Sequence, residues 1–320
     1  MLGLRVRMFI LTALLFAIVY AIISMVSASL GIGNFYFYLG LSIAMMLIQY
    51  MIGPKIVEWS MRVRYLKEDE KPELHRMVKD LAGKANLPVP RIGIAQMAIP
   101  NAFAFGRTMK DSRICVTEGI LNLLSESELK AVLGHEMSHI RNRDVLTLTL
   151  LSVIPMILYR IAWQFLFYGN RRDRNSGNTA LIGLAAFLFY FLTNLLVLYA
   201  SRVREYFADK GSIDLGNPPA QLASALYKLV YGSARMPKEA LKDVEGMKAF
   251  FANDPSRALD ELKDLKSLDL DRSGAIDANE LRALQTKTVK LNFGDKAMEL
   301  LSTHPNMLKR IKRLSEWEGN

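Results

Sequence analysis

The sequence has little cysteine and histidine, with one cysteine and four histidines in 320 residues. Cys115 cannot form an internal disulfide, and within the apolar run 114–116 it is expected to be a small buried side chain. Acidic residues are fewer than basic ones, 31 against 41, which gives a net charge of +10. No basic–aromatic interleaving and no nucleic-acid motif accompanies this charge, so nucleic acid is not expected as a partner. The basic residues flank apolar stretches, which favours attraction to anionic lipid headgroups instead.

Charged residues are absent from two long stretches near the start of the chain, residues 8–30 and 35–52. A helix needs about 20 apolar residues to cross the hydrocarbon core of a bilayer, so both stretches are predicted to span a membrane as a hairpin. A cleaved signal peptide is the alternative for the first stretch, but the second follows almost at once. Residues 145–168 and 179–200 are also mostly apolar. The prediction is therefore about four transmembrane helices.

Basic residues flank the first hairpin at both outer ends, with Arg5 and Arg7 before it and Lys55 and Arg62 after it. The positive-inside rule then puts the N-terminus and the residues after Lys55 in the cytoplasm. The basic loop 171–174 between the second pair of apolar stretches runs against this rule. Either the first hairpin dominates the topology, or the second pair is only partly inserted.

Two of the scarce histidines lie in one motif, His-Glu-x-x-His at residues 135–139. Ser125 and Glu128 form a Ser-x-x-Glu capping box at the start of the helical pattern that contains it. Residues four apart lie on one helical face, so His135 and His139 can bind one metal ion. Glu136 points near the same site, where it can take a proton from a water at the metal. The alternative, two surface histidines on a helix, is disfavoured by the cap and by the acidic motif downstream.

That acidic motif follows the fourth apolar stretch and contains Glu205 and Asp209, which are again four residues apart. Catalytic zinc sites use three protein ligands and leave one position for water, and two histidines with one glutamate form such a set. Glu205 is therefore predicted as the third ligand. Asp209 is predicted to accept the free N–H of a ligating histidine and fix its tautomer. The alternative is a pair of solvated charges on a helix that leaves the membrane.

These motifs, in this order, resemble the HtpX family of membrane-embedded zinc metalloproteases, relatives of the CAAX prenyl endopeptidases. The matching segments are the N-terminal hairpin, Pro100-Asn101-Ala102-Phe103-Ala104, residues 135–139, the second apolar pair, residues 201–209 and Thr303-His304-Pro305. The resemblance implies one zinc ion per chain on His135, His139 and Glu205, with Glu136 as general base. It also implies a multi-pass protein of the plasma (inner) membrane whose active site faces the cytoplasm and degrades misfolded or damaged membrane proteins. Four membrane stretches are too few for the prenyl protease branch.

Two further segments are candidates for contact with substrate. His304 is the candidate donor to the tetrahedral oxyanion; alternatively it only caps a C-terminal helix from about Asn306 to Trp317, whose basic run 309–313 is expected to be solvated or to face the membrane. Alternation in residues 101–106 fits a half-exposed strand, and an exposed edge can pair with an extended peptide. The predicted substrate strand comprises Asn101, Ala102, Phe103 and Ala104. A plain core strand is the alternative.

Residues 269–280 match the calcium-binding loop of an EF-hand and are not part of the HtpX pattern, so they are interpreted as an insertion. The predicted ligands are Asp269, Asp271, Ser273, the backbone carbonyl of Ala275, Asp277 and Glu280. Three hypotheses remain: a structural calcium or magnesium site, a calcium sensor that regulates the protease, and an unoccupied relic. The structural site is favoured.

The expected fold is mainly α: an integral membrane protein with about four transmembrane helices and a cytoplasmic, zincin-like (gluzincin) α+β peptidase domain with a small sheet. The predicted divisions are an N-terminal transmembrane hairpin (1–55), the first part of the peptidase domain (56–144), the second apolar pair (145–200) and the second part of the peptidase domain (201–320), with the EF-hand-like loop (269–280) inside it. The predicted function is zinc-dependent cleavage of unfolded or membrane proteins at the bilayer. The alternative is a catalytically silent membrane scaffold or calcium sensor.

Overall fold

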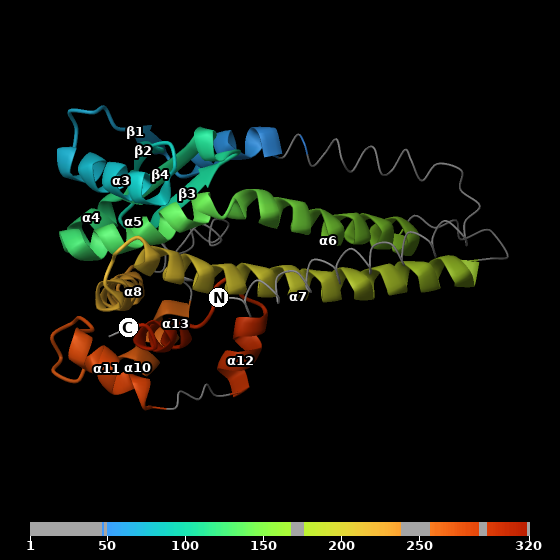
Figure 1. Cartoon of the computed structure of the whole chain (residues 1–320). Helices are drawn as coiled ribbons and strands as arrows, with labels where there is room; N and C mark the ends of the chain where they lie inside the picture. The colour runs from blue at the N-terminus through green and yellow to red at the C-terminus, as the bar shows by residue number, and fades with distance from the viewer. Residues whose placement is uncertain (1–46, 48–49, 168–175, 238–256, 288–292, 319–320) are drawn as a thin grey trace. The chain divides into compact units, whose positions relative to one another are not determined.

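The computed structural model describes residues 47, 50–167, 176–237, 257–287 and 293–318 (Figure 1). The predicted membrane hairpin, 8–30 and 35–52, lies almost entirely outside the described residues, as does the basic loop 171–174. The chain divides into two compact units. One consists of Met1–Ile52 with Leu146–Ser201, and the other of Gly53–Val145 with Arg202–Asn320.

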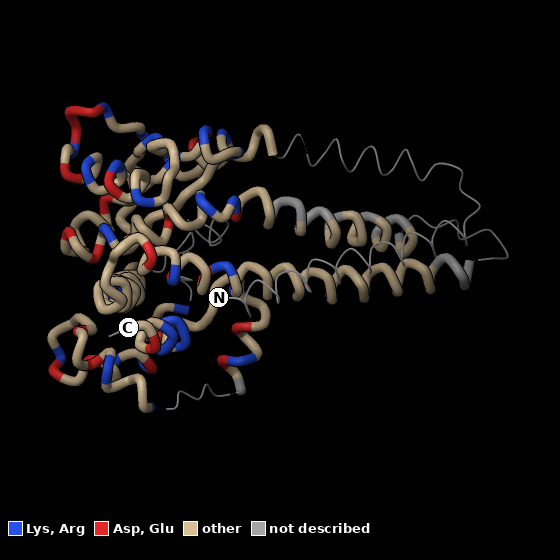
Figure 2. Tube along the Cα trace, in the orientation of Figure 1, with Lys and Arg blue, Asp and Glu red and all other residues tan. Residues whose placement is uncertain are grey.

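Most of the described part of the first unit comes from two long helices, α6 (Asp144–Phe167) and α7 (Ser176–Asp214), whose residues 144–145 and 202–214 belong to the second unit. Leu151, Ile154 and Leu158 of α6 form a buried apolar cluster with Ala200 of α7. Residues 176–200 contain no Lys, Arg, Asp or Glu. The part of α7 over residues 180–200 is an uninterrupted uncharged stretch in Figure 2. Among the described helices, one, over Ala180–Asp214, has the length and apolar composition needed to cross a membrane. The mainly helical fold is thus confirmed, and the number of membrane spans stays a prediction.

The second unit contains a small mixed sheet with strand order β1-β2-β4-β3. Its strands are β1 (Val63–Tyr65), β2 (Arg91–Ala95), β3 (Ala102–Gly106) and β4 (Ser112–Thr117). β2 and β4 pair in parallel, with Ile92 opposite Ile114, whereas β1 and β3 pair antiparallel to their neighbours. The small sheet predicted before the metal-binding helix is therefore present, and β1 is an additional strand that the sequence interpretation did not include.

Strand β3 lies at an edge of the sheet, but its side chains are covered on both faces. Phe103 and Phe105 pack into one apolar cluster with Cys115, with Val57 of the helix over residues 50–60, and with Met61 just after that helix. Ala102, on the opposite face, belongs to the main core. The expectation of a half-exposed strand is therefore wrong, because this short helix covers the face that alternation alone would leave to solvent. Cys115 is buried, as predicted.

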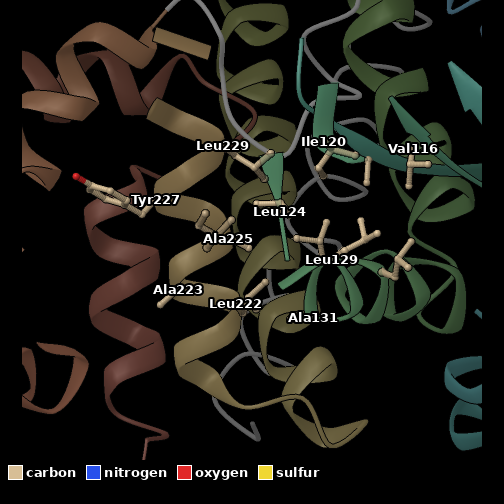
Figure 3. Packing of buried hydrophobic residues seen from close by; sticks show 14 of the residues in the cluster. Val116, Ile120, Leu124, Leu129, Ala131, Leu222, Ala223, Ala225, Tyr227 and Leu229 are labelled. Carbon is tan, nitrogen blue, oxygen red and sulfur yellow. The ribbon is translucent and has the colours of Figure 1, made fainter. Parts of the chain in front are cut away.

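Helices from both parts of the second unit enclose the main core. They are α3 (Pro72–Ala85), α4 (Glu118–Leu123), α5 (Glu126–Arg141), α8 (Pro219–Ala234), α10 (Ala258–Leu265), α11 (Ala278–Gln285) and α13 (Met307–Ser315). The same unit also contains α12 (Phe293–Leu300). Figure 3 shows apolar side chains of β4, α4 and α5 gathered against those of α8. Because α8 packs against α5 as well as α10 and α13, it ties the predicted metal-binding helix to the C-terminal helices.

Candidate metal centre

Helix α5 presents the two predicted histidine ligands side by side. The predicted capping box is confirmed: Ser125 Oγ accepts the backbone N–H of Glu128, and the Glu128 carboxylate accepts that of Ser125. Glu128 is also bound by Ser224 and Lys228 of α8, which anchors the start of the helix. His135 and His139 follow one turn apart, with their Nε2 atoms separated by 3.1 Å and their rings edge to face.

The predicted third ligand comes from α7. Glu205 Oε2 lies 3.5 Å from His135 Nε2, and Glu205 Oε1 lies 3.6 Å from His139 Nε2. Ligand atoms at the usual zinc distances of about 2.0–2.2 Å in a tetrahedron are separated by about 3.3–3.6 Å. The two Nε2 atoms lie 3.1 Å apart, and each lies 3.5 or 3.6 Å from one of the two Glu205 oxygens. These separations fit a single zinc ion, and two imidazoles with a carboxylate are a suitable donor set for that metal.

Two glycines let α5 and α7 approach closely enough to bring these ligands together. A Cβ atom at Gly211 would lie 2.0 Å from Ser138 Oγ and 2.5 Å from Ser138 Cβ. A Cβ atom at Gly134 would lie 2.3 Å from Asn217 Nδ2 and 2.8 Å from the Ser212 hydroxyl. Ser212 in turn donates to the backbone carbonyl of Ala131 at 2.6 Å. The crossing of the two helices is thus set by backbone-to-backbone proximity directly beside the site.

Asp209, which was predicted to accept the N–H of a ligating histidine, lies behind His135. Its Oδ1 is 2.9 Å from His135 Nδ1, and the side chain is fully buried. Arg310 of α13 binds both oxygens of this carboxylate at 2.6 and 3.0 Å and also lies 3.1 Å from Glu205 Oε2. The basic run of α13 was expected to be solvated or to face the membrane, and this is wrong for Arg310, which is 0% exposed. The apolar spacing of Met307, Ile311 and Leu314 places residue 310 on the buried face of the helix.

A second carboxylate behind the histidines was missed by sequence reasoning. Asp144, the first residue of α6, places its Oδ2 2.5 Å from His139 Nδ1, and its Oδ1 contacts the Arg204 guanidinium. Arg204 also donates to the backbone carbonyl of Asn142 at 3.1 Å. The sequence offered only a polar run after the metal motif as a signal, because the partner, Arg204, is 60 residues away on another helix.

Burial and neighbouring charges act differently on the two imidazoles. For His135, burial lowers the pKa, but the carboxylates of Asp209 and Glu205 outweigh it and raise the pKa to about 9. For His139, burial and the adjacent His135 lower the pKa below its ordinary value. One imidazole therefore carries a proton readily and the other stays neutral, as expected for two rings whose Nε2 atoms face each other.

The predicted general base, Glu136, is buried beside the histidines and groups with them as a possible ion-binding cluster. Its carboxylate accepts the backbone N–H of Ala104 in β3. Burial raises the pKa of Glu136 above its ordinary value, and the two histidines oppose that rise. The predicted substrate strand, residues 101–104, overlaps the edge strand β3 and thus contributes the backbone N–H of Ala104 to the site.

His304 is also brought to the site. It is buried, its Nε2 lies 3.9 Å from Glu205 Oε1, and its Nδ1 lies 3.0 Å from Thr303 Oγ1. Asn306 caps α13, because its side chain accepts the backbone N–H of Leu308. The alternative role of His304 as the cap is therefore filled by another residue.

The EF-hand-like loop lies apart from this cluster in the sequence and forms its own group of carboxylates. It connects α10 to α11, and Asp269, Asp271 and Glu280 each offer an oxygen within 4.8 Å of one another. Gly274 adopts a φ of +82°, which favours glycine at this turn. Asp269 Oδ2 accepts the Gly274 N–H and the Tyr227 hydroxyl, whereas its buried Oδ1 has no hydrogen-bond partner among the described residues.

Comparison with known proteins agrees with these features. Residues 68–318 match peptidase family M48. A protease HtpX homolog from Methanothermobacter thermautotrophicus is 52% identical over 71% of this chain and 86% of the relative. One from Moorella thermoacetica is 35% identical over 99% of this chain and 95% of the relative. The crystal structure of Ste24p from S. mikatae shares the fold, with a TM-score of 0.51 at 16% identity over 98% of this chain and 67% of that one. The chain therefore belongs to peptidase family M48, among the HtpX proteases, as its motifs predicted.

Proposed function

We propose that this protein is a membrane-anchored zinc endopeptidase that hydrolyses misfolded or damaged membrane proteins. The observation that carries the proposal is the fit of His135, His139 and Glu205 to one tetrahedral ion, with donor atoms 3.1 to 3.6 Å apart. Membership of peptidase family M48, which is zinc-dependent, supports the same choice of metal. These three residues would hold the ion.

The chemistry then follows from the residues around that ion. When bound, zinc supplies a Lewis acid that lowers the pKa of water to about 7 and polarises a peptide carbonyl. Glu136 takes the proton of the attacking water and passes it to the amine leaving group. Burial brings the pKa of Glu136 up towards the working pH, which suits a group that must first accept and then donate a proton.

Two further segments complete the proposed site. We assign His304 as the donor to the developing oxyanion, because its ring is buried and faces the ligand Glu205. The substrate backbone is proposed to pair along the edge strand at residues 101–104, beside the Ala104 N–H that binds Glu136. Replacement of His304 by Phe is then expected to lower kcat with little change in KM, because the oxyanion forms only after substrate binds.

The decisive variant is Glu136→Gln, compared with Glu126→Gln on the same helix. The control substitution Glu126→Gln makes the same chemical change at an exposed position. The full chain purified in detergent should bind about one zinc ion in all three proteins, whereas casein cleavage by Glu136→Gln should fall by about 10²–10⁴-fold. Zinc-loaded wild-type protein that cleaves no unfolded substrate would instead support the silent membrane scaffold.

The membrane arrangement is part of the same proposal. Residues 1–55 and 145–200 are assigned to the anchor, and residues 56–144 and 201–320 to a cytoplasmic peptidase domain. The apolar helix over Ala180–Asp214 supports the assignment. A cysteine introduced at Asn175 in a Cys115→Ser background should react with a membrane-impermeant thiol reagent only from outside the cell. Reaction from the cytoplasmic side would instead show that the second apolar pair does not cross completely.

We further propose that the loop 269–280 holds a structural calcium or magnesium ion. The converging carboxylates of Asp269, Asp271 and Glu280 support this, since they carry like charges within 4.8 Å. Calcium at millimolar concentration should raise the unfolding temperature of the wild type and of Asp264→Asn, a nearby acidic control, but not of Glu280→Gln. Equal shifts in all three proteins would contradict the site. A change of protease activity on calcium chelation, with zinc buffered, would show a sensor.

A further inference from the structure

The two histidines of the metal centre are supported in the same way on their outer sides. His135 Nδ1 lies 2.9 Å from Asp209, and His139 Nδ1 lies 2.5 Å from Asp144. A carboxylate in this position accepts the N–H of the ring, fixes the tautomer and leaves Nε2 free to bind a metal. The two aspartates come from different helices, α7 and α6, so the likeness is not a repeat within one segment.

Each aspartate is in turn held by a buried arginine. The Arg310 guanidinium binds Asp209 through two nitrogens, at 2.6 and 3.0 Å. The Arg204 guanidinium contacts Asp144 and also donates to the Asn142 carbonyl at 3.1 Å. A planar guanidinium that binds an oxygen pair and a second group restricts the rotation of the carboxylate, which a lysine ammonium cannot do in the same way.

The charges of this cluster explain why arginine occurs twice. The buried carboxylates of Glu136, Glu205, Asp144 and Asp209 lie around the two imidazoles. Unpaired buried charges are strongly disfavoured, so carboxylates in such a place need cations beside them. The two guanidinium groups compensate two of the four negative charges, and a divalent ion would compensate the other two.

We propose that Arg204 and Arg310 are positioning residues for the metal, each acting through its aspartate on one ligand histidine. The proposal rests on the zinc site described above. It predicts an order of effects, because Arg310 contacts the ligand Glu205 at 3.1 Å as well as Asp209. Among the described residues, Arg204 contacts one carboxylate, that of Asp144, which faces His139. Loss of the Arg310 guanidinium should therefore weaken zinc binding more than loss of the Arg204 guanidinium.

The test measures zinc affinity by competition with a chelator, in the full-length protein in detergent, for Arg204→Met and Arg310→Met. Arg113→Met is the matched control, since Arg113 is also a buried arginine bound to carboxylates, those of Asp111 and Glu58, on β4. Both site variants should lose about 10–100-fold in zinc affinity, as expected for partners of ligating histidines, and their cobalt-substituted forms should show a shifted visible absorption spectrum. Arg204→Lys and Arg310→Lys should recover part of the affinity.

The control should lose thermal stability without a change in zinc affinity or cobalt spectrum. If the two site variants behave like the control, the arginines are structural only and the proposal is wrong. Should Arg310→Met fail to fold, the Arg204 variants still test the proposal. Asp144→Asn and the double variant Asp144→Asn/Arg204→Met should then bind zinc equally, because Arg204 acts through Asp144. Additive losses would refute that route, whereas a wild type that binds no zinc would overturn the zinc site itself.

Discussion

A methyl group added at Gly211 should push the ligand-bearing helices apart. Gly211 lies on α7, two residues after Asp209, and faces Ser138 of α5, one residue before the ligand His139. In Gly211→Ala the new Cβ would lie 2.5 Å from Ser138 Cβ. Ordinary carbon–carbon contacts are about 3.5–4.0 Å. The serine hydroxyl can rotate away, but its Cβ is fixed to the helix backbone, so the helices must separate by about 1 Å.

The size of the effect follows from two opposing contributions. Overpacking of this kind costs about 1–3 kcal/mol, whereas the change from glycine to alanine inside a helix gains about 1 kcal/mol. The net loss of stability should therefore be at most about 2 kcal/mol. Zinc binding should be affected more strongly than stability. Metal–ligand distances tolerate a deviation of only about 0.2 Å, and Glu205 would move with α7 by several times that distance.

The assay is zinc affinity together with thermal unfolding of the metal-free protein. Gly211→Ala should bind zinc at least tenfold more weakly, while the free energy of unfolding falls by no more than about 2 kcal/mol. Gly83→Ala is the control, because no atom lies within 4 Å of a Cβ added there in α3; it should keep wild-type zinc affinity. The double variant Gly211→Ala/Ser138→Gly adds a Cβ on α7 and removes the opposing Ser138 Cβ from α5, so it should restore zinc binding. Wild-type affinity in Gly211→Ala, or no recovery in the double variant, would refute the close-crossing argument.

Three further outcomes are expected. Zinc binding at pH 7.5 should release about one proton, because burial lowers the pKa of His135 but Asp209 and Glu205 raise it to about 9. Zinc affinity should then rise with pH up to about 9 and level off above it. Calorimetry in two buffers of different ionisation enthalpy measures the released proton, and finding none would contradict this assignment. Ser125→Ala should destabilise the protein by about 0.5–2 kcal/mol through loss of the α5 cap, seen as a lower unfolding temperature with unchanged zinc affinity. Leu226→Ala should cost about 2–5 kcal/mol, since this α8 side chain is 1% exposed in the main core, and a loss below 1 kcal/mol in denaturant unfolding would contradict that placement.

Local patterns were sufficient to predict the parts of the site that lie one helical turn apart. The spacing of His135 and His139, and that of Glu205 and Asp209, follows from helix periodicity alone, and the structure brings the two pairs together. The cap of α5 was equally readable, because Ser125 and Glu128 are three residues apart. The presence of the small sheet could also be predicted, since its strands are short apolar runs between prolines and glycines.

Contacts between distant segments could not be read in the same way. Asp144 lies in a polar run after the metal motif that does not reveal its partner, Arg204. Arg310 belongs to a basic run that was expected to be solvated or to face the membrane, but it is buried. The exposure of β3 was misjudged because alternation describes the strand and not the helix over residues 50–60 that covers it. Charge and polarity in the sequence state what a side chain can do, whereas its partner decides whether it is solvated or buried.

The charge balance of the metal centre also explains why it draws on α13 as well as on α5 and α7. Helix α5 brings two imidazoles and Glu136, and α7 adds Glu205 and Asp209, so these two helices alone collect more buried carboxylates than Arg204 can neutralise. Arg310 of α13 supplies the missing cation and joins Asp209 to Glu205. Because a ligand that binds only the folded state stabilises it, zinc binding and the docking of α13 should reinforce each other. Changes that loosen α13 should therefore weaken zinc binding without touching any ligand.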